Sequence, residues 1–325
     1  MKGAGMTMLT QEEIKFSNAL KSVARNEGIK QYIQNSEELY PLFMRAAKRF
    51  VSGEKRPDAM KKAKELIEKG YLVSLEFIGE NTKTADECQL AKEEFLSLIH
   101  ELGAHRMKST ISFDLSHIGM AIDRKLGLEN LKEMAQAAEQ YELNLMISME
   151  ESEKTDRILE IYKEAASIYK NIGITLQVHL KRSLDDLTEL LNYPGKIRLV
   201  KGAYQEPEEL VIGRSEELTE RYLKFIEKSV KANHPISIAT HDEGILQQVL
   251  ERGYIHDSNV ELEMLDGVRP DLIKKVKDQG YHARVYVTYG TEWYLYLAHR
   301  IAEYPPNIYT AVSDIIGSET KVSPY

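Results

Sequence analysis

From about residue 70 onward, the chain alternates short apolar segments with longer amphipathic ones. The short segments have the composition of strands, and each is followed by a segment whose apolar residues have helical spacing. The expected strands are 71–79, 109–119, 143–150, 172–180, 196–204, 235–242, 259–267 and 282–290. The expected helices are 84–101, 128–141, 154–170, 185–193, 215–233, 243–252, 270–279 and 291–304. Eight strand–helix units predict an α/β fold of the closed (β/α)8 barrel type, similar to a TIM barrel.

An open, doubly wound sheet is the alternative architecture for such an alternation. Its glycine fingerprint, GxGxxG, is absent from the sequence, so the barrel is preferred. Residues 1–69 are expected to form an N-terminal helical segment, and residues 70–325 the barrel. The last helical pattern, 291–304, follows the eighth strand and is expected to lie over the barrel mouth.

The expected strands alternate apolar and polar residues, so each strand has two different faces. Helices cover the outside of a barrel, and therefore the apolar face should point outward and the polar face inward. The inward set would include Glu76, Asp114, Ser148, Gln177, Arg198, His241, Glu263 and Tyr286. So many buried polar groups need partners. We interpret them as the binding surface of a large polar ligand; the alternative is a buried ion network that satisfies itself.

Composition excludes several classes of function. The net charge of −8 and the pI of about 5.7 argue against nucleic acid as the main partner. The single cysteine, Cys88, cannot form an internal disulfide, and this predicts a cytoplasmic protein. The nine histidines do not cluster at ligand spacing, so no metal site is predicted. No apolar run is long enough to span a bilayer, and we expect at most transient contact with the inner face of a membrane.

Several motifs together resemble the proline dehydrogenase family. They are KIRLVKGAY (196–204), IATHD (238–242), ELEMLDG (261–267) and RVYVTYGTEWYLYLAHRIAEYPPN (284–307), with ISMEESEKTD (147–156) and GITLQVHLKRS (173–183) between the earlier strands. The resemblance runs in order from about residue 70 to 307. It implies an FAD-dependent (β/α)8 barrel that oxidises proline to pyrroline-5-carboxylate and passes the electrons to a quinone.

The residues that the resemblance assigns to the cofactor are well matched. Arg198 and Lys201 resemble contacts to the flavin and the pyrophosphate, and Gln177 resembles a contact to the isoalloxazine ring. Fixed cations are what a pyrophosphate requires. The alternative for both cations is a salt bridge to inward carboxylates. The resemblance adds Gly202, Ala203, Thr240, His241 and Glu303 to the cofactor-binding set.

The residues assigned to the substrate depart from the family pattern. A strand that usually reads ISLKL reads ISFDL here, so Asp114 replaces a lysine that would pair with the proline carboxylate. Ser148 stands where the family has an aspartate, and His299 stands where it has the first of two adjacent arginines. The seventh strand reads ELE in place of EFQ. The matching substrate residues are Leu265, Tyr286, Tyr296 and Arg300.

We therefore expect an FAD-dependent dehydrogenase that oxidises proline or, in preference, a proline-related cyclic amine, to an imine by hydride transfer to flavin N5. Losing two charge-assisted contacts to a carboxylate would weaken proline binding by roughly 100-fold. One alternative is a flavin-binding barrel without dehydrogenase activity, acting as a sensor or partner protein. Another is a metal- or acid/base-dependent hydrolase or lyase that uses Asp114, Glu263 and His241.

Overall fold

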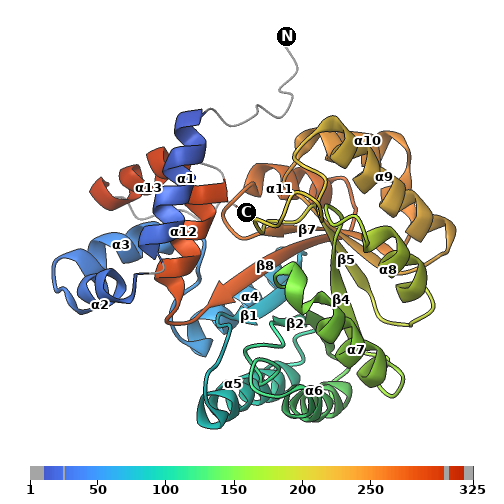
Figure 1. Cartoon of the computed structure of the whole chain (residues 1–325), viewed down its shortest axis with the longest axis horizontal. Helices are drawn as coiled ribbons and strands as arrows, with labels where there is room; N and C mark the ends of the chain where they lie inside the picture. Colours follow the sequence, from blue (N-terminus) through green and yellow to red (C-terminus); the bar gives the residue numbers. More distant parts are fainter. Residues whose placement is uncertain (1–10, 25, 304–306, 318–324) are drawn as a thin grey trace.

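Eight parallel strands close into a barrel in sequence order, with β1 paired to β8. The computed structural model describes residues 11–24, 26–303, 307–317 and 325 (Figure 1). The strands are β1 Leu72–Phe77, β2 Thr110–Phe113, β3 Asn144–Ile147, β4 Ile172–Gln177, β5 Ile197–Val200, β6 Ile236–Ala239, β7 Val260–Leu265 and β8 Ala283–Tyr289. Each lies within a segment that the sequence predicts as a strand, and the closed barrel is confirmed.

A helix follows every strand (Figure 1). These helices are α5 Ala85–Ala104, α6 Arg124–Glu139, α7 Thr155–Ala166, α8 Ser183–Leu190, α9 Glu216–Lys231, α10 Glu243–Glu251, α11 Pro270–Asp278 and α12 Trp293–Glu303. Helices α5 to α11 pack around the outside of the barrel, whereas α12 lies with the N-terminal helices. Two short 3-10 helices, Ser152–Lys154 and Tyr254–His256, lie in the connections. Side-chain caps start several helices; Thr84, Asp123 and Ser215, for example, each accept a backbone N–H from the first turn.

The main core lies between the strands and the surrounding helices, as the alternation of the strands predicts. Ile111 and Phe113 of β2 are fully buried on the outward face, and the Phe113 ring lies 5.6 Å from that of Phe95 in α5. Burying each such side chain contributes about 1.5–3 kcal/mol. The side chains on the polar face of the strands point into the interior of the barrel.

A second core joins the N-terminal helices to α12. These helices are α1 Gln11–Ala24, α2 Glu27–Asn35 and α3 Leu39–Ala47, and α13 Asn307–Ile316 packs with them on one side of the barrel (Figure 1). In contrast, α4 Arg56–Glu68 joins the barrel core through Ala59, Ala63 and Leu66. A division of the chain at residue 70 stays a prediction, and the packing favours a boundary before α4.

Helix α12 is fixed at the end of β8 by residues from the N-terminal segment. Trp293 is fully buried and donates its indole N–H to Glu54 at 2.8 Å. The Ser17 hydroxyl donates to the carbonyl of Ala302 at 2.8 Å. The backbone N–H of Ser52 donates to Thr288 of β8 at 2.9 Å. The N-terminal helices therefore position the helix that carries Tyr296, His299 and Arg300. Within the described ranges, no helix is long and apolar enough to cross a membrane.

Candidate active site at the barrel mouth

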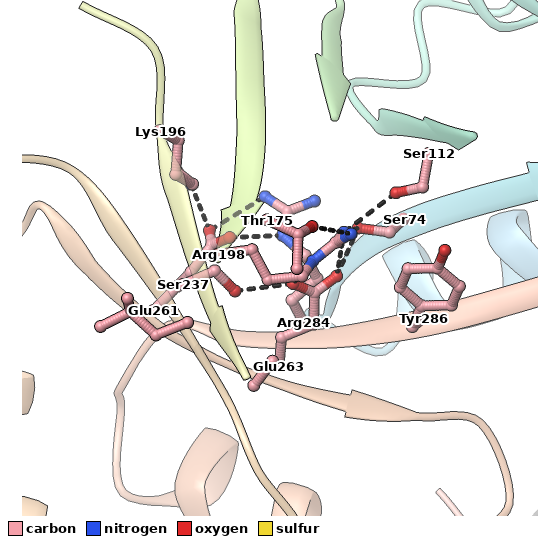
Figure 2. Close-up of polar contacts among 12 residues, drawn as sticks. Ser74, Ser112, Thr175, Lys196, Arg198, Ser237, Glu261, Glu263, Arg284 and Tyr286 are labelled. Carbon is pink, nitrogen blue, oxygen red and sulfur yellow. Dashed lines mark hydrogen bonds and ion pairs between the residues drawn. The ribbon is translucent and has the colours of Figure 1, made fainter. Parts of the chain in front are cut away.

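An ion cluster fills the end of the barrel where the strands begin. Arg284 of β8 donates to Glu261 of β7 at 2.7 and 3.0 Å, and the Lys196 ammonium lies 2.7 Å from the same carboxylate (Figure 2). Arg284 also donates to the carbonyl of Val73 at 2.7 Å. Burial opposes ionisation, but Arg284 and Lys196 lower the pKa of Glu261 to about 2. The Glu261 carboxylate is therefore fully compensated.

A second ion pair lies one layer closer to the mouth. Arg198 of β5 donates to Glu263 of β7 at 2.7 and 2.8 Å, with both side chains buried (Figure 2). Glu263 also accepts the hydroxyls of Ser74 at 2.7 Å and Ser237 at 2.6 Å. The second Arg198 amino group donates to Ser112 at 2.9 Å. Burial opposes the ionisation of Glu263, but the charge and hydrogen bonds of Arg198 hold the pKa of Glu263 below its ordinary value.

These two layers correct the interpretation of the polar interior as a ligand surface. In these two layers the charged side chains pair with one another. This is the self-satisfied buried ion network that the sequence analysis gave as the alternative. Every guanidinium nitrogen of Arg198 has a partner in the barrel, counting a 3.5 Å contact to Thr175. The inward position of Arg198 and Glu263 is confirmed, whereas a contact from Arg198 to a cofactor stays a prediction.

Above these layers, Glu76 and Tyr286 form the floor of the mouth. The Tyr286 hydroxyl donates to Glu76 at 2.8 Å, and its ring lies over the Arg198 guanidinium at 4.8 Å. Burial raises the pKa of Glu76 to about 7; the Tyr286 hydrogen bond and the charges of Arg198 and Arg300 oppose that rise only in part. Glu76 is thus a carboxyl group that can exchange a proton near neutral pH.

Replacing Glu76 with glutamine is expected to stabilise the protein more at pH 8 than at pH 5. The folded state holds the Glu76 proton more tightly than the unfolded chain, so ionising it reduces stability as the pH rises from about 4.5 to about 7. The benefit of Glu76→Gln should reach up to about 3 kcal/mol above pH 7. Urea unfolding at both pH values measures it, with Glu129→Gln on the exposed face of α6 as the control. A benefit that does not grow with pH would contradict this assignment.

Asp114 follows β2 and lies at the mouth beside other carboxyl groups. Burial and then the charges of Glu150, Glu76 and Glu80 raise the pKa of Asp114 well above its ordinary value. Ser148 follows β3, and its backbone N–H donates to the carbonyl of Phe113 at 2.9 Å. The sequence places Asp114 and Ser148 within the second and third strands, whereas β2 ends at Phe113 and β3 at Ile147, so both residues come directly after neighbouring strands.

Helix α12 brings the remaining predicted substrate residues to the mouth. The Arg300 guanidinium lies over the Tyr296 ring at 4.9 Å, and its charge acts on both Glu76 and His241. His299 is half-buried beside it. Leu265 ends β7, and its backbone N–H donates to His241. Glu303 ends α12, but its side chain lies outside the described residues.

The predicted cofactor residues line the rim formed by β4, β5 and β6. Gln177 donates its side-chain amide to the carbonyl of Glu150 at 2.8 Å. The Lys201 ammonium contacts Asp242 at 2.8 Å, and the backbone N–H of Asp242 donates to the Thr240 hydroxyl at 3.1 Å. Gly202 and Ala203 follow Lys201 in the same loop. Gly202 has a φ of 108° and packs so closely on His179 that an added Cβ would lie 1.4 Å from the ring.

Two observations fit a flavin at this rim. The Nε2 atom of His241 accepts the Leu265 N–H at 3.0 Å, and burial lowers the pKa of His241 to about 3. The neutral ring therefore carries its proton on Nδ1, which can donate to an acceptor. His179 is buried, and its Nε2 atom has no hydrogen-bond partner in the described chain. The hydrogen-bonding edge of a flavin ring would suit the free ring nitrogens of His241 and His179. The Lys201 ammonium would suit a pyrophosphate.

Sequence reasoning did not assign three mouth residues to the site. Glu76 was placed inward but was given no role. Glu150 is fully buried and accepts the Ser116 backbone N–H at 3.0 Å and the Lys154 ammonium at 2.8 Å. Burial raises the pKa of Tyr204, and the nearby charge of Asp114 contributes next. Their positions just beyond strand ends are the signal that could have identified Glu150 and Tyr204.

A closed barrel with titratable groups at the carboxyl ends of its strands has the architecture of a (β/α)8 enzyme. Comparison with known proteins narrows the class. Residues 59–304 match the family model for proline dehydrogenase. The chain is 33% identical over 270 residues to proline dehydrogenase from Deinococcus radiodurans, covering 80% of this chain and 87% of that protein. It is 30% identical over 264 residues to proline dehydrogenase 1 of Bacillus subtilis (strain 168), an alignment that also covers 80% of this chain and 87% of that protein.

The chain belongs to the proline dehydrogenase family, whose members are flavin-containing oxidoreductases that act on the CH–NH group of proline. Its fold is similar to that of proline utilization A from Bdellovibrio bacteriovorus, with a TM-score of 0.75 and 18% identity. That alignment covers 99% of this chain but only 43% of the other protein. The family resemblance inferred from the motifs and the barrel inferred from the alternation are both confirmed.

Proposed function

We propose that the protein is an FAD-dependent dehydrogenase that oxidises a cyclic secondary amine of the proline type to the imine. Family membership supports the reaction class. Within that class, we propose a proline-related amine whose carboxylate is absent or blocked as the preferred substrate, ahead of free L-proline. The observation that carries this preference is Asp114, a carboxyl group at the mouth among the carboxylates of Glu76, Glu80 and Glu150.

A substrate carboxylate in this position would meet like charge. Bringing a carboxylate next to a partly buried carboxylate costs several kcal/mol, or it forces a proton onto one partner. Arg300 is the arginine retained from the two-arginine pattern, and His299 supplies at most a weaker positive charge. The mouth therefore offers fewer cations to a carboxylate than the family pattern does.

Bound FAD would supply the two-electron acceptor, taking hydride from the ring carbon beside the nitrogen. The protein holds the ring and removes a proton. The amine must be neutral when hydride leaves, because an ammonium nitrogen has no lone pair to form the C=N bond. Glu76 and Asp114 are the mouth carboxyl groups whose raised pKa values suit them to accept the nitrogen proton. His299 is a third candidate for this role.

The residues proposed to hold the cofactor are those of the β4–β6 rim and the end of α12. Gln177 and His241 would contact the flavin ring, and Lys201 the pyrophosphate, with Gly202 giving close backbone approach. Arg198, Ala203, Thr240 and Glu303 complete the proposed set. A quinone is the proposed final electron acceptor, reached by a cytoplasmic protein through transient contact with a membrane.

An absorbance spectrum of the purified protein, followed by anaerobic addition of ring amines, tests this function. We expect a flavin spectrum that pyrrolidine-type amines bleach. A yellow protein that no amine reduces would instead favour a flavin-binding barrel without dehydrogenase activity. A colourless protein that does not take up FAD would contradict the proposal.

A further inference from the structure

Tyr325 contacts the end of β7, far from its own position in the sequence (Figure 1). Its hydroxyl donates to Asp266 Oδ1 at 2.7 Å and accepts the backbone N–H of Gly267 at 3.0 Å. Its ring lies edge-on to the ring of Tyr71, with the two centroids 5.5 Å apart. The Lys62 ammonium of α4 lies 5.0 Å from the centre of the Tyr325 ring. Both the ring and the hydroxyl of Tyr325 are therefore held against the barrel.

Asp266 depends on Tyr325 because the Asp266 carboxyl group is buried. Only 6% of Asp266 is exposed, and burial raises the pKa of its carboxyl group. One carboxylate oxygen accepts the Tyr325 hydroxyl, and the other lies 3.4 Å from the Lys62 ammonium. A buried carboxyl group that loses a donor is strongly disfavoured. Removing the Tyr325 hydroxyl should therefore shift the chain around Asp266 toward water.

Asp266 belongs to a turn, residues 265–268, that also forms part of the mouth. A backbone hydrogen bond of 3.3 Å between its first and last residues closes this turn. The N–H of Leu265 donates to His241 Nε2 at 3.0 Å, and the N–H of Asp266 donates to the carbonyl of Tyr286 at 2.9 Å. The turn therefore connects the carboxylate–hydroxyl contact on its outer side to two residues of the mouth.

Gly267 confines the same turn on another side. Its φ of 75° favours glycine, and an added Cβ would lie 1.8 Å from the carbonyl oxygen of Arg49. The backbone that follows α3 thus packs directly on the turn. On the opposite side, the Tyr325 hydroxyl is a contact that a single side-chain substitution can remove.

The hydrogen bond from Leu265 decides which nitrogen of His241 carries the proton. A neutral imidazole has one N–H, so a ring that accepts a backbone N–H at Nε2 carries its proton on Nδ1. His241 is neutral near pH 7, because burial lowers its pKa to about 3. If the turn moved away, Nε2 would lose its donor and the two tautomers would become closer in energy.

We propose that Tyr325 is a positioning residue: by holding the turn after β7, it keeps the Leu265 N–H on His241 and the His241 proton on Nδ1. Nδ1 is the nitrogen that the proposed function directs toward the flavin, so Tyr325 supports cofactor binding through His241. The tautomer is a property of the chain alone, whereas the effect on the cofactor rests on the proposed function.

Tyr325→Phe tests this inference, because it keeps the ring against Tyr71 and removes only the hydroxyl. Nitrogen-15 NMR of the full chain, labelled at histidine, distinguishes protonated from unprotonated ring nitrogens, and His241→Gln identifies the His241 signals. The wild type should carry the His241 proton on Nδ1. In Tyr325→Phe, the ratio of the Nε2–H tautomer to the Nδ1–H tautomer should rise about 5-fold, the effect of one hydrogen bond. The Kd for FAD, measured by the fluorescence of released flavin, should rise by about the same factor.

Two controls separate positioning from general loosening of the fold. Tyr289→Phe removes a hydroxyl that donates to Glu94 at 2.9 Å on the outer side of the barrel. It should lower the Tm as Tyr325→Phe does, but leave the His241 tautomer and the Kd for FAD as in the wild type. His234 lies at the other end of the barrel, with its Nε2 atom 3.0 Å from the carbonyl of Gly195. Its signals should show the Nε2–H tautomer in every variant.

An unchanged His241 tautomer ratio in Tyr325→Phe, or an equal change in Tyr289→Phe, would overturn the inference. A change confined to Tyr325→Phe that leaves the Kd for FAD unaltered would uphold the positioning of His241. That result would contradict the proposed contact between His241 and the flavin, so the two claims can fail separately.

Discussion

Replacing Glu263 with alanine is expected to lower the free energy of unfolding by about 3–5 kcal/mol. The change leaves the buried Arg198 guanidinium without the carboxylate that holds it at 2.7 and 2.8 Å. It also removes the acceptor of the Ser74 and Ser237 hydroxyls. Chemical denaturation of the wild type and the variant measures the difference.

Two comparisons make this result specific to the buried pair. The double variant Arg198→Met, Glu263→Leu should recover much of the loss, because a buried ion pair can be replaced by apolar groups of similar size. Glu129→Ala, which breaks an exposed pair with Lys125, should change stability by less than about 1 kcal/mol. If Glu263→Ala is as mild as Glu129→Ala, the ion layers do not stabilise the barrel interior as described.

Changing Asp114 to lysine together with His299 to arginine is expected to raise kcat/KM for L-proline by about 100-fold. The two substitutions place two cations at the mouth where the family pattern has them, and each charge-assisted contact to a carboxylate contributes about 1.5–3 kcal/mol. Anaerobic flavin reduction by L-proline, followed over a range of proline concentrations, measures the change. The gain should appear mainly as tighter binding, since both groups address the carboxylate and not the carbon that loses hydride.

The matched control carries the same change in formal charge away from the mouth. Glu129 lies on the outer face of α6, and His256 is exposed near the start of β7. Glu129→Lys with His256→Arg should leave proline oxidation as in the wild type. A similar rise in both double variants would show that net charge, and not the pocket, controls proline binding. No rise in the mouth variant would mean that our account of Asp114 and His299 is wrong.

The fold could be predicted almost entirely from the sequence. Strand and helix periods are local properties, and a barrel of parallel strands leaves an apolar face on one side of every strand. The packing of α4 could not be predicted, because its amphipathic pattern does not say which core it joins. Ala59, Ala63 and Leu66 belong to the barrel core, whereas α1 to α3 pack with α12 and α13.

The candidate site was predicted less completely, and the reason is physical. Strand parity places Arg198 and Glu263 inward, but parity alone cannot say whether two inward charges meet each other or a ligand. Their pairing depends on the stagger of β5 and β7 across the barrel, which only the structure gives. Asp114 could be singled out from the sequence because it departs from a recognisable motif. That burial and the charges of Glu150 and Glu76 raise the pKa of Asp114 depends on how the folded chain brings these residues together, which the sequence does not give.

The central claim is that this family member oxidises a ring amine whose carboxylate is absent or blocked. Its most direct test is the ratio of second-order rate constants for anaerobic flavin reduction by L-prolinamide and by L-proline, measured on the wild-type protein by stopped flow. The two compounds share a ring and differ in the carboxylate, so the ratio isolates the response of the mouth to negative charge. We predict that L-prolinamide reduces the flavin faster by at least about 10-fold. Rapid, saturable reduction by low millimolar L-proline, with no advantage for L-prolinamide, would contradict the claim.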